Sequence, residues 1–77
     1  MKVFLERGIT HLDLHGIKHA EAHQEILDFV YQYQDSLPLI IICGNSNKML
    51  QIVSDVLETA SVEFSSPRYG ILRIVKV

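Results

Sequence analysis

Residues 10–16, Thr-His-Leu-Asp-Leu-His-Gly, place one carboxylate and two imidazoles within a short stretch. Apolar and polar residues alternate here, which predicts a β-strand whose two leucines share one face. His11, Asp13 and His15 then share the other face, where alternate side chains lie about 6–7 Å apart at the backbone. At that spacing Asp13 could orient His15 as a general base or acid. The alternative is that His15 only ends the strand and that Asp13 accepts a main-chain hydrogen bond in the following turn.

A second group of polar residues follows a buried strand. Leu39–Cys43 is a continuous apolar run, typical of a central strand with parallel pairing, and it leads into Gly44, Asn45, Ser46 and Lys48. In strand–helix–strand units, ligands bind beyond the carboxyl ends of the parallel strands, where the next helix presents free N–H groups to anions. We therefore expect this loop to hold a phosphate. A purely structural turn is the alternative.

Basic and aromatic residues near the C-terminus are further candidates for binding. If Arg73 projects from the sheet face that carries His11, the two side chains could hold a phosphate backbone together with Arg68. Tyr69 could stack on a base. The alternative is an ordinary solvated hairpin.

The elements that must position these residues follow from hydrophobic periodicity. Residues 18–34 repeat apolar side chains at helical spacing, and a second apolar stripe begins near Lys48. Residues 62–65 and 71–77 have the composition of two further strands, joined by a turn. The segment from Val3 to Leu5 is ambiguous, since it fits either a short strand or a segment laid over exposed core.

Together these elements predict an α/β two-layer sandwich in the order β-α-β-α-β-β. We expect a four-stranded mixed sheet with both helices on one face, because ionisable groups on strand 10–15 leave the other face unsuited to helix packing. Strand 39–43 is apolar on both faces, so the open face needs some cover from the N-terminal segment or from a partner. We assign residues 10–77 to the domain and residues 1–9 to an N-terminal extension.

Length and composition exclude several classes of protein. A chain of 77 residues forms one small domain. Its net charge of −2 argues against strong non-specific nucleic-acid binding through bulk electrostatics, although a local basic patch is compatible with it. The single cysteine excludes an intrachain disulfide and fits a reducing compartment. No apolar run approaches the roughly 18 residues that span a membrane, so we expect a cytoplasmic protein.

Two other features are weaker candidates for chemistry. His19 and His23 have the spacing of two metal ligands on one helix face. The sequence between them does not match the His-Glu-x-x-His motif of zinc proteases, so we expect packed helix histidines and no metal. Cys43 ends an apolar strand, and we expect a buried small hydrophobe rather than a nucleophile.

The stretch Leu12-Asp13-Leu14-His15-Gly16, followed by an amphipathic helix, resembles the Smr (small MutS-related) domain family. The resemblance extends over about residues 10–77 and includes the final strand preceded by Gly70. It implies a two-layer β-α-β-α-β-β fold and nucleic-acid binding, with endonuclease activity on DNA or RNA in several members. The second family motif, His-Gly-x-Gly or Thr-Gly-x-Gly, corresponds to residues 43–46, Cys-Gly-Asn-Ser, which keep the first glycine only.

From these observations we expect a nucleic-acid-binding domain that acts as a metal-independent endonuclease and prefers RNA over DNA. Asp13 and His15 are the expected catalytic residues, without a metal or other cofactor. Partners would be RNA or branched DNA, in a ribosome-associated setting, with no membrane, and the chain would be a monomer or weak homodimer. The alternatives are a non-catalytic nucleic-acid or ribosome-binding module, favoured by the altered second motif, and a small protein-interaction domain. The expected phosphate-binding residues are Gly16, Gly44, Asn45, Ser46, Lys48, His11, Arg73 and Arg68.

Overall fold

The computed structural model of the protein describes residues 2–77 and contains a five-stranded sheet and two α-helices. A short 3-10 helix, Gln34–Ser36, follows the first α-helix. The elements in chain order are β1 (Val3–Glu6), β2 (Ile9–Asp13), α1 (His19–Tyr33), β3 (Leu39–Ile42), α2 (Asn47–Thr59), β4 (Glu63–Arg68) and β5 (Ile71–Lys76).

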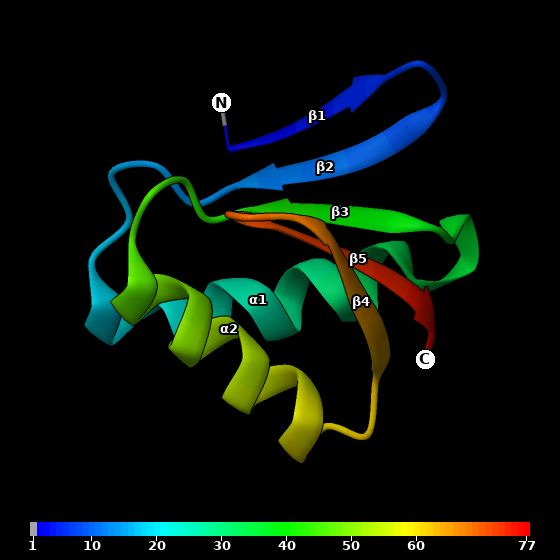
Figure 1. Ribbon diagram of the computed structural model, residues 1–77. Helices are drawn as coiled ribbons and strands as arrows, with labels where there is room; N and C mark the ends of the chain where they lie inside the picture. Colours follow the sequence, from blue (N-terminus) through cyan, green and yellow to red (C-terminus); the bar gives the residue numbers. More distant parts are fainter. Residues whose placement is uncertain (1) are drawn as a thin grey trace.

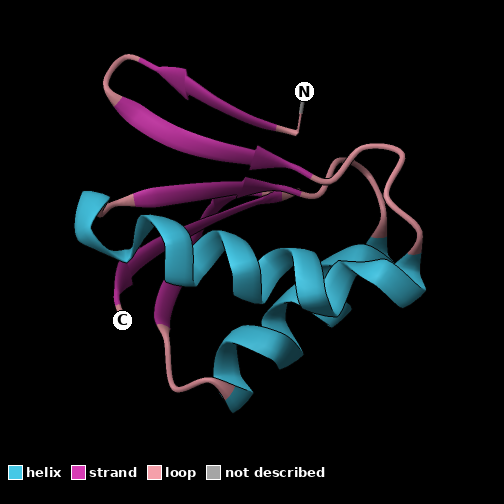
Figure 2. Cartoon of the chain, turned by 180° about the vertical axis from the view of Figure 1, so that it is seen from behind, coloured by secondary structure: helices cyan, strands magenta, loops and turns pink. Residues whose placement is uncertain are grey.

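The strands lie in the order β1-β2-β3-β5-β4. Strands β2 and β3 are parallel and are connected through α1, whereas the other neighbouring pairs are antiparallel. Both helices pack on the same face of the sheet (Figures 1 and 2). The expected α/β two-layer arrangement with a mixed sheet is therefore confirmed.

The expected number of four strands and the expected order β-α-β-α-β-β are wrong, because the segment before Thr10 contributes a strand of its own. The strands and α-helices follow the order β-β-α-β-α-β-β. Val3–Glu6 pairs with Ile9–Asp13 as a hairpin, and its two turn residues, Arg7 and Gly8, have φ values of 54° and 79°. Positive φ at both positions suits a tight hairpin turn whose twist matches the flanking strands. Strand β1 is thus an edge strand of the sheet, and it lies within residues 1–9, which were expected to form an N-terminal extension.

Two element boundaries also differ from the expected ones. Strand β2 ends at Asp13, so His15 lies in the following turn and does not share the strand face with His11. Strand β4 continues to Arg68 with irregular pairing and includes Pro67, whereas the expected strand ended at residue 65. A proline is tolerated here because β4 is an edge strand, where its missing N–H faces no neighbour.

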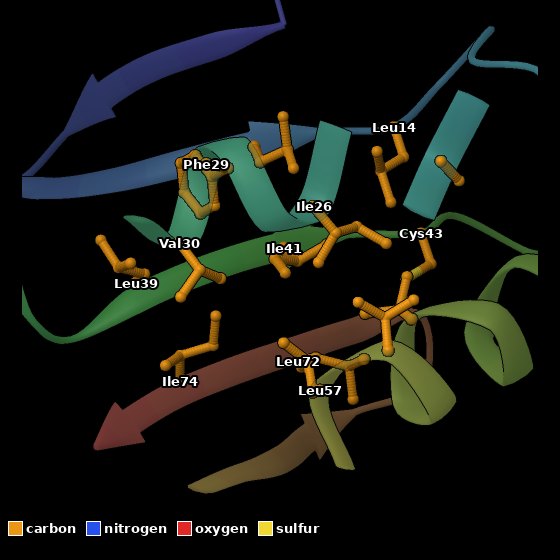
Figure 3. Close-up of a cluster of buried hydrophobic side chains, with 14 of the residues drawn as sticks. Leu14, Ile26, Phe29, Val30, Leu39, Ile41, Cys43, Leu57, Leu72 and Ile74 are labelled. Carbon is orange, nitrogen blue, oxygen red and sulfur yellow. The ribbon is translucent and has the colours of Figure 1, made fainter. Parts of the chain in front are cut away.

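The hydrophobic core lies between the sheet and the two helices (Figure 3). Helix α1 contributes side chains at helical spacing, including Ile26 and Phe29, and α2 contributes Val53 and Leu57. The inward-facing side chains of the three middle strands complete the cluster: Thr10, Leu12, Leu39, Ile41, Leu72 and Ile74. Alternate strand residues point to the opposite face of the sheet, and neither α1 nor α2 packs there (Figures 1 and 2).

Candidate nucleic-acid interface

The loops that follow β2 and β3 begin side by side at one edge of the sheet (Figures 1 and 2). Asp13 is the register partner of Ile42, and the N–H of Leu14 donates to the carbonyl oxygen of Ile42 at 3.0 Å. The turn between β4 and β5 joins them, since the N–H of Cys43 donates to the carbonyl oxygen of Gly70 at 2.7 Å. Three connections that are distant in the sequence therefore meet at the carboxyl ends of the parallel strands, as the topology requires.

The first of these loops is held by Asp13. Its Oδ1 accepts a hydrogen bond from the main-chain N–H of His15 at 2.9 Å, and the N–H of Ile17 donates to Leu14 O at 3.0 Å. These bonds form a compact turn that leaves the side chains of His15 and Lys18 exposed and Asp13 half-buried. The hydrogen bond of Asp13 thus goes to the backbone of His15, in agreement with the turn-forming alternative considered from the sequence.

The second loop leads directly into helix α2. The hydroxyl of Ser46 accepts a hydrogen bond from the N–H of Met49 at 3.0 Å and so caps the helix. The hydroxyl of Tyr69, from the β4–β5 turn, donates to the side-chain oxygen of Asn47. Gly44, Asn45 and Lys48 are exposed in the same loop.

Loss of the α2 cap has an expected and measurable cost. The substitution Ser46→Ala removes the acceptor for the Met49 N–H and should lower the free energy of unfolding by about 1 kcal/mol. Urea denaturation followed by circular dichroism would measure the difference. Ser54→Ala is the control, because Ser54 lies within α2 and caps neither end. Equal losses in both variants would show that the Ser46 hydroxyl does not stabilise the helix.

Cys43 lies beneath this edge and is not part of the exposed surface. Its side chain is buried, and burial raises the pKa of the thiol from 9.0 to about 11. A thiol with that pKa carries almost no thiolate at neutral pH, and the thiolate is the nucleophile. The structure therefore supports the prediction of a packed hydrophobe at this position.

The raised pKa of Cys43 makes stability depend on pH at the alkaline end. The folded protein keeps the thiol protonated between pH 9 and about 11, whereas the unfolded chain releases the proton there. The buried, protonated thiol therefore contributes to the free energy of unfolding below pH 9, and the wild type should lose roughly 2 kcal/mol of this contribution as the pH rises to 11. Urea titrations of wild type and Cys43→Ala at several pH values would measure the effect. Parallel curves for the two proteins would contradict it.

His11 and Arg73 lie on the open face of the sheet rather than in the loops. The Nδ1 of His11 donates to the carbonyl oxygen of Ile9 at 2.8 Å, which fixes the ring and leaves Nε2 as an acceptor in the neutral form. The His11 ring stacks on Phe4, with centroids 4.9 Å apart and planes 11° apart. Phe4 could not be predicted as part of this face, because its role depends on β1 pairing with β2 in this register.

Registers place the two arginines relative to these groups. Arg73 pairs with Ile40, which pairs with His11, so Arg73 is two strands away from the imidazole. Arg68 pairs with Ile71, one row nearer to the loops. Both guanidinium groups belong to exposed residues. The candidate residues therefore divide into an edge group and an open-face group, which meet at Asp13.

Other kinds of site are absent from the part of the chain that the structure describes. Residues 2–77 hold no group of three or more His, Cys, Asp or Glu side chains placed to share a metal ion, and no pocket opens between them. The expectation that His19 and His23 are packed helix histidines is wrong, because both residues are exposed. Neither α1 nor α2 is long and apolar enough to cross a bilayer.

Comparisons with models of protein families, with curated proteins and with solved structures found no significant match to this chain. The resemblance to the Smr family therefore remains a prediction.

Proposed function

We propose that the chain is a nucleic-acid-binding domain whose contact surface is formed by the exposed residues of the loops 13–18 and 44–48 and of the turn 68–70. The observation that carries the proposal is the convergence of the loops after β2 and β3, which leaves His15, Lys18 and Lys48 exposed near the start of α2. An exposed imidazole with flexible cations around it suits a phosphate group. Because the overall charge is −2, binding would depend on local groups such as these and not on bulk electrostatic attraction.

With RNA bound, the imidazole of His15 would supply acid–base chemistry. His15 accepts the proton of a 2′-hydroxyl while the hydroxyl oxygen attacks the adjacent phosphorus, and water protonates the 5′-oxygen as the phosphorus–oxygen bond breaks. In the alternative assignment water takes the 2′-hydroxyl proton and His15 donates a proton to the 5′-oxygen. The products of this transfer are a 2′,3′-cyclic phosphate and a free 5′-hydroxyl. Lys48 and the loop from Gly44 to Ser46 would bind the phosphate oxygens. Asp13 would act as a positioning residue, through its hydrogen bond to the His15 main chain.

A second candidate is a binding module without catalysis. It is favoured by the hydrogen bond of Asp13, which holds the backbone of the turn and not the imidazole of His15. Residues 2–77 also form no pocket that would exclude water from a reacting phosphate.

The two candidates differ in turnover, and both differ from a protein-interaction domain in their response to salt. The test incubates labelled structured RNA and branched DNA with the protein in EDTA and measures cleavage, then measures affinity at several salt concentrations. Cleavage supports the endonuclease. Affinity that falls steeply with salt but without cleavage supports the binding module, because phosphate contacts release counterions. The absence of both cleavage and binding would refute the proposed function.

A further inference from the structure

One row of side chains runs across the open face of all five strands. The registers place Phe4 beside His11, His11 beside Ile40, Ile40 beside Arg73, and Arg73 beside Ser65. The helices lie on the opposite face, so no helix covers the row (Figures 1 and 2). The row thus joins a pair of stacked rings on β1 and β2 to a guanidinium on β5, with an aliphatic side chain between them.

The ring pair is already fixed before any ligand arrives. Phe4 and His11 stack nearly parallel, and the hydrogen bond from His11 Nδ1 to Ile9 O holds the imidazole in place. Both residues are half-buried, so part of each side chain remains open to solvent. A base that extends such a stack gains contact without paying to order the rings, and every base has a π-face that can do so.

Neither guanidinium group on this face forms an ion pair within residues 2–77. The ion pair formed within residues 2–77 joins Lys2 to Glu25, and it involves neither Arg73 nor Arg68. Arg73 lies about 10 Å from His11 at the backbone, two strand spacings away. A long arginine side chain reaches over Ile40 from that distance, so one nucleotide on the rings leaves an adjacent phosphate within reach of Arg73.

The charge of Arg73 also decides between two kinds of occupant. A second copy of this chain, packed face to face through the isoleucines, would bury Arg73 near the middle of the interface. Burial of an arginine without a charged partner is strongly unfavourable. A phosphate supplies that partner, and the bases of the same strand cover the neighbouring apolar side chains, Ile40, Ile42 and Ile71.

We propose that the open face of the sheet binds single-stranded nucleic acid, with a base against the Phe4–His11 rings and a phosphate on Arg73. A duplex is excluded as the preferred ligand because its bases are stacked on one another and present no free faces. This inference rests on the proposed function and names its substrate class. The bound nucleic-acid strand would continue past Asp13 to the loops of the proposed contact surface. Asp13 lies on the same face as His11 and begins the loop that carries His15.

The test measures affinity by fluorescence anisotropy with a labelled 2′-O-methyl RNA of about 12 nucleotides, which cannot be cleaved through a 2′-hydroxyl. The same RNA annealed to its complement is the duplex arm, and single-stranded DNA of the same sequence separates RNA from DNA. The variants are Phe4→Leu and Arg73→Gln. Their matched controls are Tyr31→Leu, an exposed ring on α1, and Lys76→Gln, an exposed cation on the opposite face of β5. Thermal unfolding of each variant checks that it is folded.

Wild type should bind the single strand more tightly than the duplex. Phe4→Leu should weaken single-strand binding about 5- to 150-fold, and Arg73→Gln should flatten the dependence of log affinity on log salt by about 0.7. The control variants should bind like wild type.

Three outcomes would overturn the inference. If wild type binds in a salt-sensitive manner but Phe4→Leu and Arg73→Gln match their controls, the open face is not used, and the edge site stands alone. Equal or tighter binding of the duplex refutes the single-stranded substrate. If the two variants instead convert a dimer into a monomer in sedimentation experiments without affecting RNA affinity, the face belongs to a second copy. Absence of any binding by wild type refutes the proposed function itself.

Discussion

His15→Ala should lower the rate of RNA cleavage by about 10²- to 10⁴-fold and leave RNA affinity nearly unchanged. The imidazole is the exposed acid–base group at the edge where the loops after β2 and β3 meet, so its removal takes away proton transfer but few contacts. Single-turnover cleavage of a labelled structured RNA in EDTA measures the rate, and anisotropy measures the affinity. His23→Ala is the matched control, because His23 is an exposed histidine on α1.

A wild-type rate in His15→Ala would exclude this imidazole from catalysis and point to His11, whose ring is the one fixed by a hydrogen bond. Asp13→Asn then separates the two roles considered for the carboxylate. Asparagine keeps an oxygen that accepts from the His15 N–H, so a positioning role predicts a rate within about tenfold of wild type. A loss as large as that of His15→Ala would show that the negative charge of Asp13 is itself required.

The positions of the two loops could be predicted from the sequence because they depend on backbone rules. A strand–helix–strand unit places the ends of its parallel strands together, and residues 10–16 and 39–48 carry the periodicity of such a unit. The pairing of β2 with β3 realises this arrangement. The burial of Leu12 and Leu14 on the helix side follows from the same alternation, even though the strand itself ends between them at Asp13.

The partner of the Asp13 carboxylate could not be predicted, because a side chain two residues away and a main-chain N–H two residues away are equally near along the chain. In the folded turn, the main-chain N–H of His15 is the group that donates to the carboxylate. The Phe4–His11 stack depends on an edge strand of only four residues, too short for its alternation to be distinguished from chance. Both features depend on three-dimensional register, and both lie in the surface that we propose to bind nucleic acid.

The contact between Gly70 and Gly44 is another such feature, and it links the stability of the fold to the geometry of the site. Gly70 is buried in the β4–β5 turn with a φ of 83°, and a Cβ placed there would lie 2.4 Å from the carbonyl oxygen of Gly44. That oxygen belongs to backbone in the loop after β3, so it cannot swing away as a flexible side chain would. Any side chain at position 70 must therefore push the turn and the loop apart.

Gly70→Ala should consequently lower the free energy of unfolding by about 3 kcal/mol or more, from the unfavourable positive φ and the clash together. Gly8→Ala isolates the first of these terms, because Gly8 has a φ of 79° and no atom within 4 Å of the added Cβ. It should cost only about 1 kcal/mol. Urea denaturation of the two variants measures the difference. Since a domain of this size has a stability of only about 4–12 kcal/mol, the loss in Gly70→Ala is a large part of the whole. Equal losses would mean that the loop yields easily, and the edge would then lack the rigidity that a phosphate site built from main chain requires.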